Sequence, residues 1–412
     1  MICLAVDIGS TSLKAALIDE CGNVFAYRRI PFFVLDKRSA SELWFSSLRN
    51  AIFSMRENAN EKKIVSQIAA IAISGNGPTL VSENGTTLLW NEELPKKVSD
   101  EIQSVVAEKK LQASIFIPRI LAFQKLFPNE WKIANTIFSG PEFLVFQLTG
   151  ECVTFLPEKR FEKAYWNNDA LFSLSIDEKK FPRFVSFGNE IGKTSAKTNE
   201  MLGLEKSVSV FCAGPDFIAA MIGTASLEDG KLYDRAGSSE GINFATSEAL
   251  FANDIRTLPS VQSDLWNAAV LHEQSGKLFV HYKQILEAVH EKEIPYREII
   301  SESIRNKNSD GFAILEFVAN NFSKAASILI SEAKKKNMRV LFPMMVTGGQ
   351  AKNDEWMQMK ANYANLPLAT CACKDAELLG GAATAFFGAR IFSSLKEASK
   401  AIVKIDKVFE PN

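Results

Sequence analysis

The sequence is poor in the residues that metal clusters and disulfide frameworks need. It has only three histidines and six cysteines among 412 residues. His272, His281 and His290 are nine residues apart, so no two neighbours share one helix face. The cysteines are scattered, and the only close pair, Cys371 and Cys373, has no nearby histidine. We therefore expect no zinc site, and predict buried, reduced thiols in a cytoplasmic protein.

A strong charge of one sign and long hydrophobic runs are also missing. The formal net charge is -1 at pH 7, so nucleic-acid binding through a broad basic surface is not expected. No apolar run approaches the roughly 18 residues that a membrane span needs. Asp7 interrupts the first apolar run, and no signal-peptide pattern is present, so no membrane association is predicted.

What remains is an ordinary globular composition in a chain long enough for two domains. Hydrophobic residues make up 47% of the chain and charged residues 23%. The N-terminal pattern predicts three antiparallel strands, a helix and another buried strand, at 2–8, 12–19, 24–32, 39–58 and 68–75. This order indicates a mixed sheet with helices on its faces.

Farther along, residues 95–150 have a mostly helical pattern and residues 151–190 are irregular. A strand is predicted at 207–214, followed by a helix that starts near Asp216. Strands are also predicted at 231–237, 238–246, 265–272 and 277–282, and a long helix at 311–337. The last segments predict strand, helix, strand and helix at 339–349, 353–364, 366–372 and 375–390.

Two hairpin-like segments echo each other. VDIGSTSLKAALID, at 6–19, and DRAGSSEGINFAT, at 234–246, both place a Gly-Ser-Ser/Thr turn between extended stretches. Two domains of related design, each offering one turn to a shared cleft, would produce such an echo.

The first turn, DIGSTSLK at 7–14, has the composition of an anion-binding loop. Gly9 permits a tight turn whose backbone amides can approach an anion. Ser10, Thr11 and Ser12 supply hydroxyl donors, and Lys14 adds positive charge. Asp7 offers the oxygen ligand that Mg²⁺ prefers. An ordinary hairpin turn also favours these residues, so the turn alone leaves both interpretations open.

Two other glycine turns raise the same choice. In AGSSEGIN, at 236–243, Glu240 is an awkward neighbour for phosphates because like charges repel. In the segment 346–368, Gly348 and Gly349 end a strand and a helix begins near Asn353 or Asp354. A nucleotide can lie across such a turn, although an ordinary loop between a strand and a helix would look the same.

Asp216 stands between a Gly-Pro pair and an apolar run. Gly214 permits a turn, Pro215 suits a helix start, and Asp216 falls in the first helical turn, where the helix dipole favours a carboxylate. Asp216 can therefore serve as a helix cap, as a catalytic base, or as both.

Taken in order, these segments resemble the FGGY family of carbohydrate kinases, in the actin-like ATPase superfamily. The resemblance rests on six stretches: AVDIGSTSLKAALID, AISGNGPTLVSENGTTLLWNEELP, FIPRILAFQKLFPNEW with EFLVFQLTG, VFCAGPDFIAAMIGTASLEDGKLYDRAGSSEGINFAT, TGGQAKNDEWMQMKANYANLPL and DAELLGGAATAFFGA. It implies an α/β protein with two ribonuclease H-like domains and a nucleotide/sugar cleft between them. The N-terminal domain would span 1–225 and the C-terminal domain 226–412.

The resemblance also implies ATP-dependent phosphorylation of a small sugar or polyol. Asp216 would be the general base and Asp7 would organise Mg²⁺. ATP would be bound by Gly9, Ser10, Thr11, Ser12, Lys14, Gly237, Ser238, Ser239, Gly348, Gly349, Gln350 and Asn353. The acceptor would be contacted by Asn76, Gly77, Pro78, Trp90, Asn91, Glu142 and Asp216.

The sequence also departs from the family pattern. The sugar-side motif reads Gly-Asn-Gly-Pro at 75–78, where related members carry Gly-Gln-Met-His. Phe217 replaces a polar residue, and the segment at 290–325 is trimmed. Lys159, Arg160 and Lys163 could recognise an acidic acceptor, although a solvated charged face is the favoured interpretation. The trimming and Glu240 keep open a degenerate regulatory protein that binds nucleotide or sugar. An actin-like filament protein is a third alternative.

The sequence identifies neither the sugar nor the oligomeric state, for which a homodimer is a common outcome.

Overall fold

The chain divides into two compact units. The computed structural model describes residues 1–33, 39–237, 239–272 and 275–412. Unit 1 comprises Met1–Ala219 with Glu377–Ile402, and unit 2 comprises Ala220–Ala376 with Val403–Asn412. The expected division at residue 225 assigned 377–402 to the C-terminal domain, whereas these residues cluster with unit 1. The return of the chain to unit 1 is a long-range packing event that local sequence patterns do not reveal.

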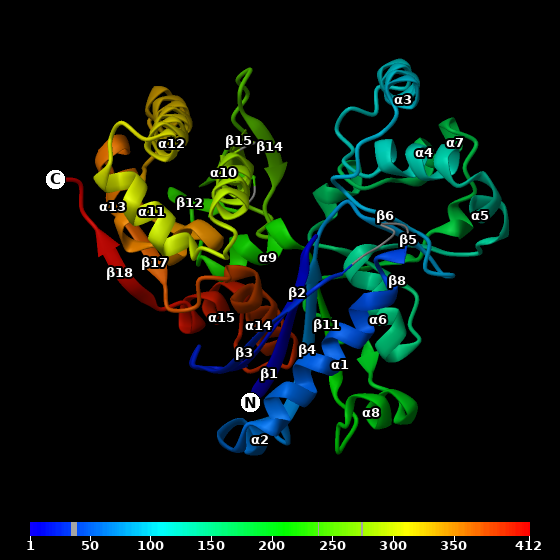
Figure 1. The fold of residues 1–412 in the computed structure, drawn as a ribbon. Helices are drawn as coiled ribbons and strands as arrows, with labels where there is room; N and C mark the ends of the chain where they lie inside the picture. The colour runs from blue at the N-terminus through cyan, green and yellow to red at the C-terminus, as the bar shows by residue number, and fades with distance from the viewer. Residues whose placement is uncertain (34–38, 238, 273–274) are drawn as a thin grey trace. The chain divides into compact units, whose positions relative to one another are not determined.

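Unit 1 is built on a six-stranded mixed sheet (Figure 1). Its order is β10 (Gly192–Lys193), β11 (Ser209–Pro215), β4 (Ile68–Gly75), β1 (Ile2–Ile8), β2 (Ser12–Asp19) and β3 (Val24–Pro31). The first three strands of the chain form an antiparallel meander, and β4 and β11 then add in parallel to β1. The predicted strands of the N-terminal region are therefore confirmed.

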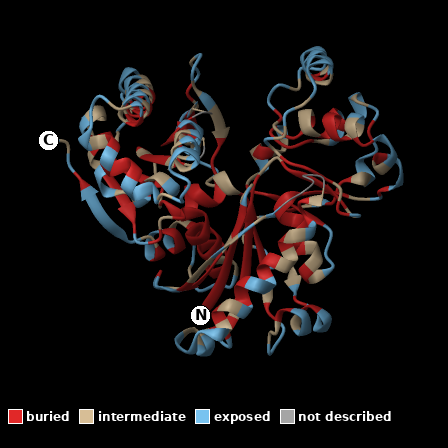
Figure 2. Cartoon of the chain, viewed as in Figure 1, coloured by how far each residue is buried: buried red, intermediate tan, exposed pale blue. Residues whose placement is uncertain are grey.

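The central strands of this sheet are apolar because both faces are covered. Every residue of β1 is buried, and Figure 2 shows the central strands as buried. The flanking helices are α1 (Glu42–Glu57), α2 (Ala59–Val65), α14 (Ala376–Gly388) and α15 (Leu395–Ile402). Gly381 of α14 approaches the paired residues Ala5 and Ala72, so small side chains let this helix lie close to the sheet.

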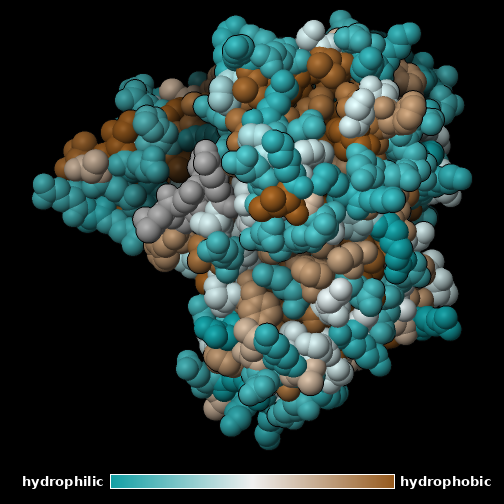
Figure 3. Space-filling model, turned by 90° about the vertical axis from the view of Figure 1, so that its right-hand side faces the viewer, coloured by the Kyte–Doolittle hydropathy of each residue, from teal (hydrophilic) through white to brown (hydrophobic). Residues whose placement is uncertain are grey.

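A large insertion lies between β4 and β11. Its strands form two small sheets: β5 (Leu80–Ser82), β6 (Thr87–Leu88) and β7 (Ile137–Ser139), and β8 (Val153–Leu156) with β9 (Arg183–Ser186). Its helices are α3 (Lys96–Glu108), α4 (Ile117–Leu126), α5 (Pro128–Ile133), α6 (Gly140–Thr149), α7 (Asn168–Ser173), α8 (Ala196–Leu202) and the 3₁₀ helices η2 (Lys159–Lys163) and η3 (Glu178–Lys180). Figure 3 shows mainly hydrophilic side chains on the face that it presents, with smaller hydrophobic groups between them.

Unit 2 is built on a seven-stranded mixed sheet. Its order is β14 (Arg256–Pro259), β15 (Trp266–His272), β13 (Glu240–Thr246), β12 (Lys231–Ala236), β16 (Leu341–Thr347), β17 (Leu368–Cys371) and β18 (Ile405–Phe409). Its helices are α10 (Ser275–His290), α11 (Tyr296–Arg305), α12 (Asp310–Lys335), α13 (Asp354–Ala364) and the 3₁₀ helix η4 (Gly349–Lys352). Helix α9 (Asp216–Gly223) runs across the boundary between the units.

One strand expected in unit 2 is part of a helix. The strand predicted at 277–282 is part of helix α10, because Phe279, Tyr282 and Leu286 recur at helical spacing and pack against the core of this unit. Helix α12 is long and apolar enough to cross a membrane by length and composition, although no continuous apolar run marks it. Its buried residues, including Phe322 and Leu329, belong to the core of unit 2.

The two large sheets share an arrangement of six strands. In each, three antiparallel strands (β1, β2, β3 and β12, β13, β15) are extended beside the first strand by two parallel strands (β4, β11 and β16, β17) and one antiparallel edge strand (β10 and β18). The sheet of unit 2 has β14 as an additional edge strand beside β15. Strands β1 and β12 occupy equivalent places, and Gly9 and Gly237 follow them in equivalent turns. The two glycine hairpins that echo each other in the sequence thus occupy equivalent places in the two sheets, and the predicted α/β fold class is confirmed.

Candidate active site

The first glycine turn joins β1 to β2. The Gly9 amide donates to the Ser12 carbonyl at 2.9 Å, which closes the turn. Thr11 at its tip is exposed. Ser12 is buried, and its hydroxyl accepts from Arg29 Nε at 3.0 Å. The turn therefore presents Thr11 outward, whereas Ser12 stabilises the turn from inside.

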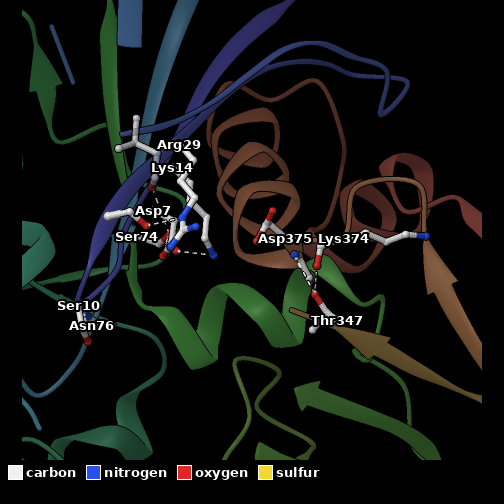
Figure 4. Close-up of polar contacts among 12 residues, drawn as sticks. Asp7, Ser10, Lys14, Arg29, Ser74, Asn76, Thr347, Lys374 and Asp375 are labelled. Carbon is white, nitrogen blue, oxygen red and sulfur yellow. Dashed lines mark hydrogen bonds and ion pairs between the residues drawn. The ribbon is translucent and has the colours of Figure 1, made fainter. Parts of the chain in front are cut away.

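Asp7 lies at the base of this turn among other charged groups. It is 3% exposed, accepts a hydrogen bond from Ser74 Oγ at 3.1 Å, and has Lys14 Nζ at 3.7 Å (Figure 4). Burial raises the pKa of Asp7 to about 7. The Lys14 ammonium opposes this rise, and the Glu377 and Asp216 carboxylates add to it. Unit 1 therefore gathers three carboxylates and one lysine in the same electrostatic environment.

Glu377 is the member of this group that the sequence reading missed. It lies in the first turn of α14 and is 7% exposed. Within the described part of the chain, its buried Oε2 has no hydrogen-bond partner. Because an unpartnered buried carboxylate oxygen is costly, Glu377 has capacity for a ligand that supplies positive charge or a donor.

Asp216 begins helix α9 directly after β11. Gly214 has φ +70°, and the ring of Phe155 would lie 2.4 Å from a Cβ placed there, so only glycine suits this bend. Pro215 is the last residue of the strand rather than the first of the helix. Phe217, the next residue, has its ring 6.5 Å from that of Phe161. The local geometry thus places Asp216, half-exposed, at a strand-to-helix junction that requires glycine at position 214.

The expected sugar-side loop meets this junction. Pro215 Cβ lies only 3.0 Å from the place where a Gly77 Cβ would stand, so the loop packs against the residue before Asp216. Asn76 Nδ2 donates to Ser10 Oγ at 3.1 Å, and Figure 4 shows these two residues side by side. Trp90 Nε1 donates to the same oxygen at 3.0 Å. Unit 1 thereby joins the phosphate-type turn to two expected sugar contacts.

Arg119, another residue that the sequence reading missed, supports the Trp90 loop. Its guanidinium donates to the Glu92 carbonyl at 2.9 Å and also to the Trp90 carbonyl. Asn91 between them is exposed. An arginine in a helical segment is usually a surface residue, so nothing in the sequence marked this one as a loop anchor.

Glu142 does not have the geometry expected of a sugar contact. Its side chain is fully buried, and burial raises its pKa. One oxygen accepts from the Phe155 amide at 2.8 Å, and the other accepts from the Ser139 hydroxyl. Both oxygens are thus used to join α6 to β7 and β8, which gives Glu142 a structural role.

In unit 2, the turn after β12 contains Gly237, Ser238 and Ser239. Ser238 lies outside the described residues, and the Gly237 amide donates to the Ser239 carbonyl at 3.0 Å. Glu240, expected to repel phosphates, is buried and points into unit 2. It forms an ion pair with Lys360 and accepts from Ser275 Oγ at 2.7 Å. Its charge is therefore compensated inside the protein.

The glycine turn after β16 is fixed against the same hairpin. Gly348 has φ +94°, and the Ala236 carbonyl would lie 2.6 Å from a Cβ there. Gly349 is exposed, and no atom lies within 4 Å of the position that a Cβ would occupy there. Gln350 Nε2 donates to the Gly237 carbonyl at 3.2 Å, and Asn353 caps α13 through the Trp356 amide at 2.9 Å. The backbone of Gly349 is therefore accessible beside the turn at Gly348.

An aspartate also precedes helix α14, which follows β17. Asp375 directly precedes α14, whereas Asp216 is the first residue of α9, and Asp375 pairs with Lys352 at 3.0 Å. Thr347 Oγ1 donates to the Lys374 carbonyl at 2.7 Å and accepts from the Ala376 amide at 3.0 Å (Figure 4). The two related sheets therefore use the same kind of strand-to-helix junction.

Comparisons with known proteins agree with this architecture. Residues 278–389 match the model of the FGGY family of carbohydrate kinases, C-terminal domain. A xylulose kinase of Lactococcus lactis subsp. lactis (strain IL1403) is 23% identical over 469 residues, which cover 99% of this chain and 92% of that protein.

Two solved structures show the same fold. A ligand-bound xylulose kinase from Lactobacillus acidophilus has a TM-score of 0.80 at 18% identity, covering 100% of this chain and 94% of that one. Plasmodium falciparum glycerol kinase with ADP has a TM-score of 0.75 at 16% identity, again covering 100% and 94%. The match of residues 278–389, the full-length relative and the shared fold together make the chain similar to the FGGY family of carbohydrate kinases.

Proposed function

We propose that the protein transfers the γ-phosphoryl group of ATP to a hydroxyl of a small sugar or polyol, with Asp216 as the general base. The observation that carries this proposal is that the sugar-side loop and Asp7 both lie close to the strand-to-helix junction at Asp216 in unit 1. Gly77 of the sugar-side loop packs against Pro215, and the Asp216 carboxylate contributes to the electrostatic environment of Asp7. The proposed base Asp216, the proposed Mg²⁺ ligand Asp7 and the proposed acceptor loop at Gly77 are thus close to one another in unit 1.

The residues around Asp7 suit Mg²⁺. Mg²⁺ commonly binds through one or two carboxylates together with waters and substrate phosphates. Among the described residues, no group of three or more histidine, cysteine or acidic side chains could hold a metal by itself. Asp7 and the unpartnered oxygen of Glu377 are consistent with the sparser arrangement. When bound, Mg²⁺ would neutralise phosphate charge, and Asp7 would orient its water ligands.

Nucleotide binding is proposed for the glycine turns of each unit. In unit 1, the Gly9 turn with Ser10, exposed Thr11 and half-buried Lys14 would contact phosphates. In unit 2, the proposed contacts are Gly237, Ser238 and Ser239 for phosphates and Gly348, Gly349, Gln350 and Asn353 for adenosine. Ser12 and Asn353 would act indirectly, since their side chains are used inside the turn and at the helix cap.

Asp216 would supply the proton chemistry. Phosphoryl transfer depends mainly on positioning and charge stabilisation. A carboxylate within reach of the acceptor hydroxyl can take its proton as the oxygen–phosphorus bond forms. The half-exposed position of Asp216 at the start of α9 leaves it accessible to such a hydroxyl.

The acceptor would be a small polyhydroxylated molecule. Asn76, Gly77, Pro78, Trp90 and Asn91 are the proposed contacts, and the two relatives above are named for xylulose and glycerol. Phe217, packed near Phe161, offers no hydrogen bond, so we propose a pocket with one polar contact fewer. Cytoplasmic location and homodimerisation stay predictions.

The test is an assay of ADP release over a panel of pentuloses, hexuloses, aldoses and polyols. Turnover of at least one acceptor is expected. The alternative, a degenerate regulatory member, loses one of its two arguments because Glu240 is paired with Lys360. Calorimetry with Mg·ADP separates the two: nucleotide binding without turnover of any acceptor would favour the regulatory protein.

A further inference from the structure

Two carboxylates lie beneath the second phosphate-type turn. In the β12–β13 hairpin, Ala236 pairs with Glu240 and Asp234 pairs with Ile242. Because side chains alternate along a strand, Asp234 and Glu240 project from the same face as diagonal neighbours. Both are buried, at 0% and 2% exposure. Two like charges so close together, directly before and after the turn, require compensation.

Lys360 of α13 supplies that compensation. Its side chain is fully buried, its Nζ lies 2.6 Å from Asp234 Oδ2, and it also contacts Glu240 Oε1. The ammonium lies 4.1 Å from the centre of the Phe322 ring, so aromatic packing closes the site from α12. No solvent reaches this group of charges, and its members depend on one another for solvation.

In this group, one cation faces two acids. Burial raises the pKa of Asp234 well above its usual value, with Lys360 opposing and Glu240 adding to the rise. Burial acts in the same sense on Glu240, but Lys360 and Ser275 outweigh it and lower the pKa. Lys360 therefore favours the ionised form of Glu240.

A relay of hydrogen bonds connects these charges to the turn. Ser275 Oγ donates to Glu240 Oε2 at 2.7 Å and accepts from Gln350 Nε2 at 3.2 Å. The same Gln350 nitrogen reaches the Gly237 carbonyl at 3.2 Å, and Gln350 Oε1 accepts from Trp356 Nε1 at 3.0 Å. The orientation of Gln350, and with it that of the Gly237 carbonyl, therefore depends on where Glu240 is held.

We propose that Lys360 is a positioning residue for nucleotide binding: it draws the Glu240 charge into the interior and, through Ser275 and Gln350, fixes the turn at Gly237. This inference rests on the proposed function, since it assumes that the turn receives nucleotide phosphates. A purely structural lysine would stabilise unit 2 without affecting how tightly the folded protein binds nucleotide. The two roles therefore differ in a measurable way.

The experiment is calorimetric titration with Mg·ADP of the wild type, Lys360→Met and the double variant Glu240→Gln/Lys360→Met, with folding checked by circular dichroism. In Lys360→Met, Glu240 loses its counter-charge, and affinity should fall about tenfold, as expected for one uncompensated charge near the phosphates. The double variant removes that charge and should recover most of the affinity. Equal affinity in all three folded proteins would overturn the inference.

If Lys360→Met does not fold, a second variant tests the same inference. Ser275→Ala removes the relay without changing any charge, and it should weaken Mg·ADP binding severalfold while the protein stays folded. Unchanged affinity would contradict the inference. Wild-type protein that binds no Mg·ADP at all would instead refute the proposed function, and the inference with it.

Discussion

The indole nitrogen of Trp90 donates a hydrogen bond to the hydroxyl of Ser10 at 3.0 Å. Trp90 belongs to the proposed acceptor loop and Ser10 to the proposed phosphate turn, so one atom links the two. Asn76 Nδ2 donates to the same oxygen at 3.1 Å. A serine hydroxyl has two acceptor lone pairs and one donor hydrogen. With both lone pairs used, the Ser10 proton is left to donate to another group, such as a ligand oxygen.

Ser10→Ala should therefore weaken acceptor binding more than nucleotide binding. Trp90 and Asn76 would lose their shared partner, and we expect KM for the acceptor to rise about tenfold, the scale of one or two lost hydrogen bonds. Ser10→Thr keeps the hydroxyl and serves as the control. Steady-state kinetics on both substrates provides the measurement, and an unchanged acceptor KM would refute the proposed link.

Arg119 should matter for the acceptor although it lies outside the predicted site. Arg119→Met removes the donors to the Trp90 and Glu92 carbonyls, so the loop should loosen. We expect a severalfold higher acceptor KM with nearly unchanged nucleotide KM. Lys125→Met, on the same helix but in an exposed ion pair with Glu101, is the matched control. Equal effects of the two variants would show that Arg119 does not position the loop.

Glu142→Gln should affect pH-dependent stability rather than sugar binding. Because burial raises the pKa of Glu142 in the folded protein, ionisation costs more in the folded state than in the unfolded one. The wild type should lose stability relative to Glu142→Gln as pH rises above about 4.3, the usual value for glutamate. Urea denaturation at several pH values measures this difference. A pH-independent difference, together with a raised acceptor KM, would support the sugar contact expected from the sequence.

Much of the fold could be predicted because local patterns decide it. Buried strands such as β1 and β4 are largely apolar runs, and glycine turns separate β1 from β2, β2 from β3 and β12 from β13. The segment 277–282 was mistaken for a strand because six residues are too few to separate the two periodicities when a long helix begins there.

The candidate site was harder to predict because burial and pairing depend on distant segments. The sequence alone predicts that Glu240 repels phosphate, because its partner Lys360 lies 120 residues farther along the chain. Glu377 reaches the Asp7 environment only because the chain returns to unit 1 after residue 376. Glu142 was assigned from a motif, and its burial depends on the packing of α6 against β7 and β8.

The central claim is that Asp216 is the base of a carbohydrate kinase, and Asp216→Asn tests it most directly. Removing the carboxylate while keeping the shape should lower kcat by at least about 10² for any acceptor that the wild type uses. The folded variant should still bind Mg·ADP in calorimetry, since Asp216 belongs to the acceptor side. The decisive measurement is ADP release by wild type and Asp216→Asn with the same acceptor. A large loss of turnover with nucleotide binding retained is the predicted result, and equal turnover would contradict the account.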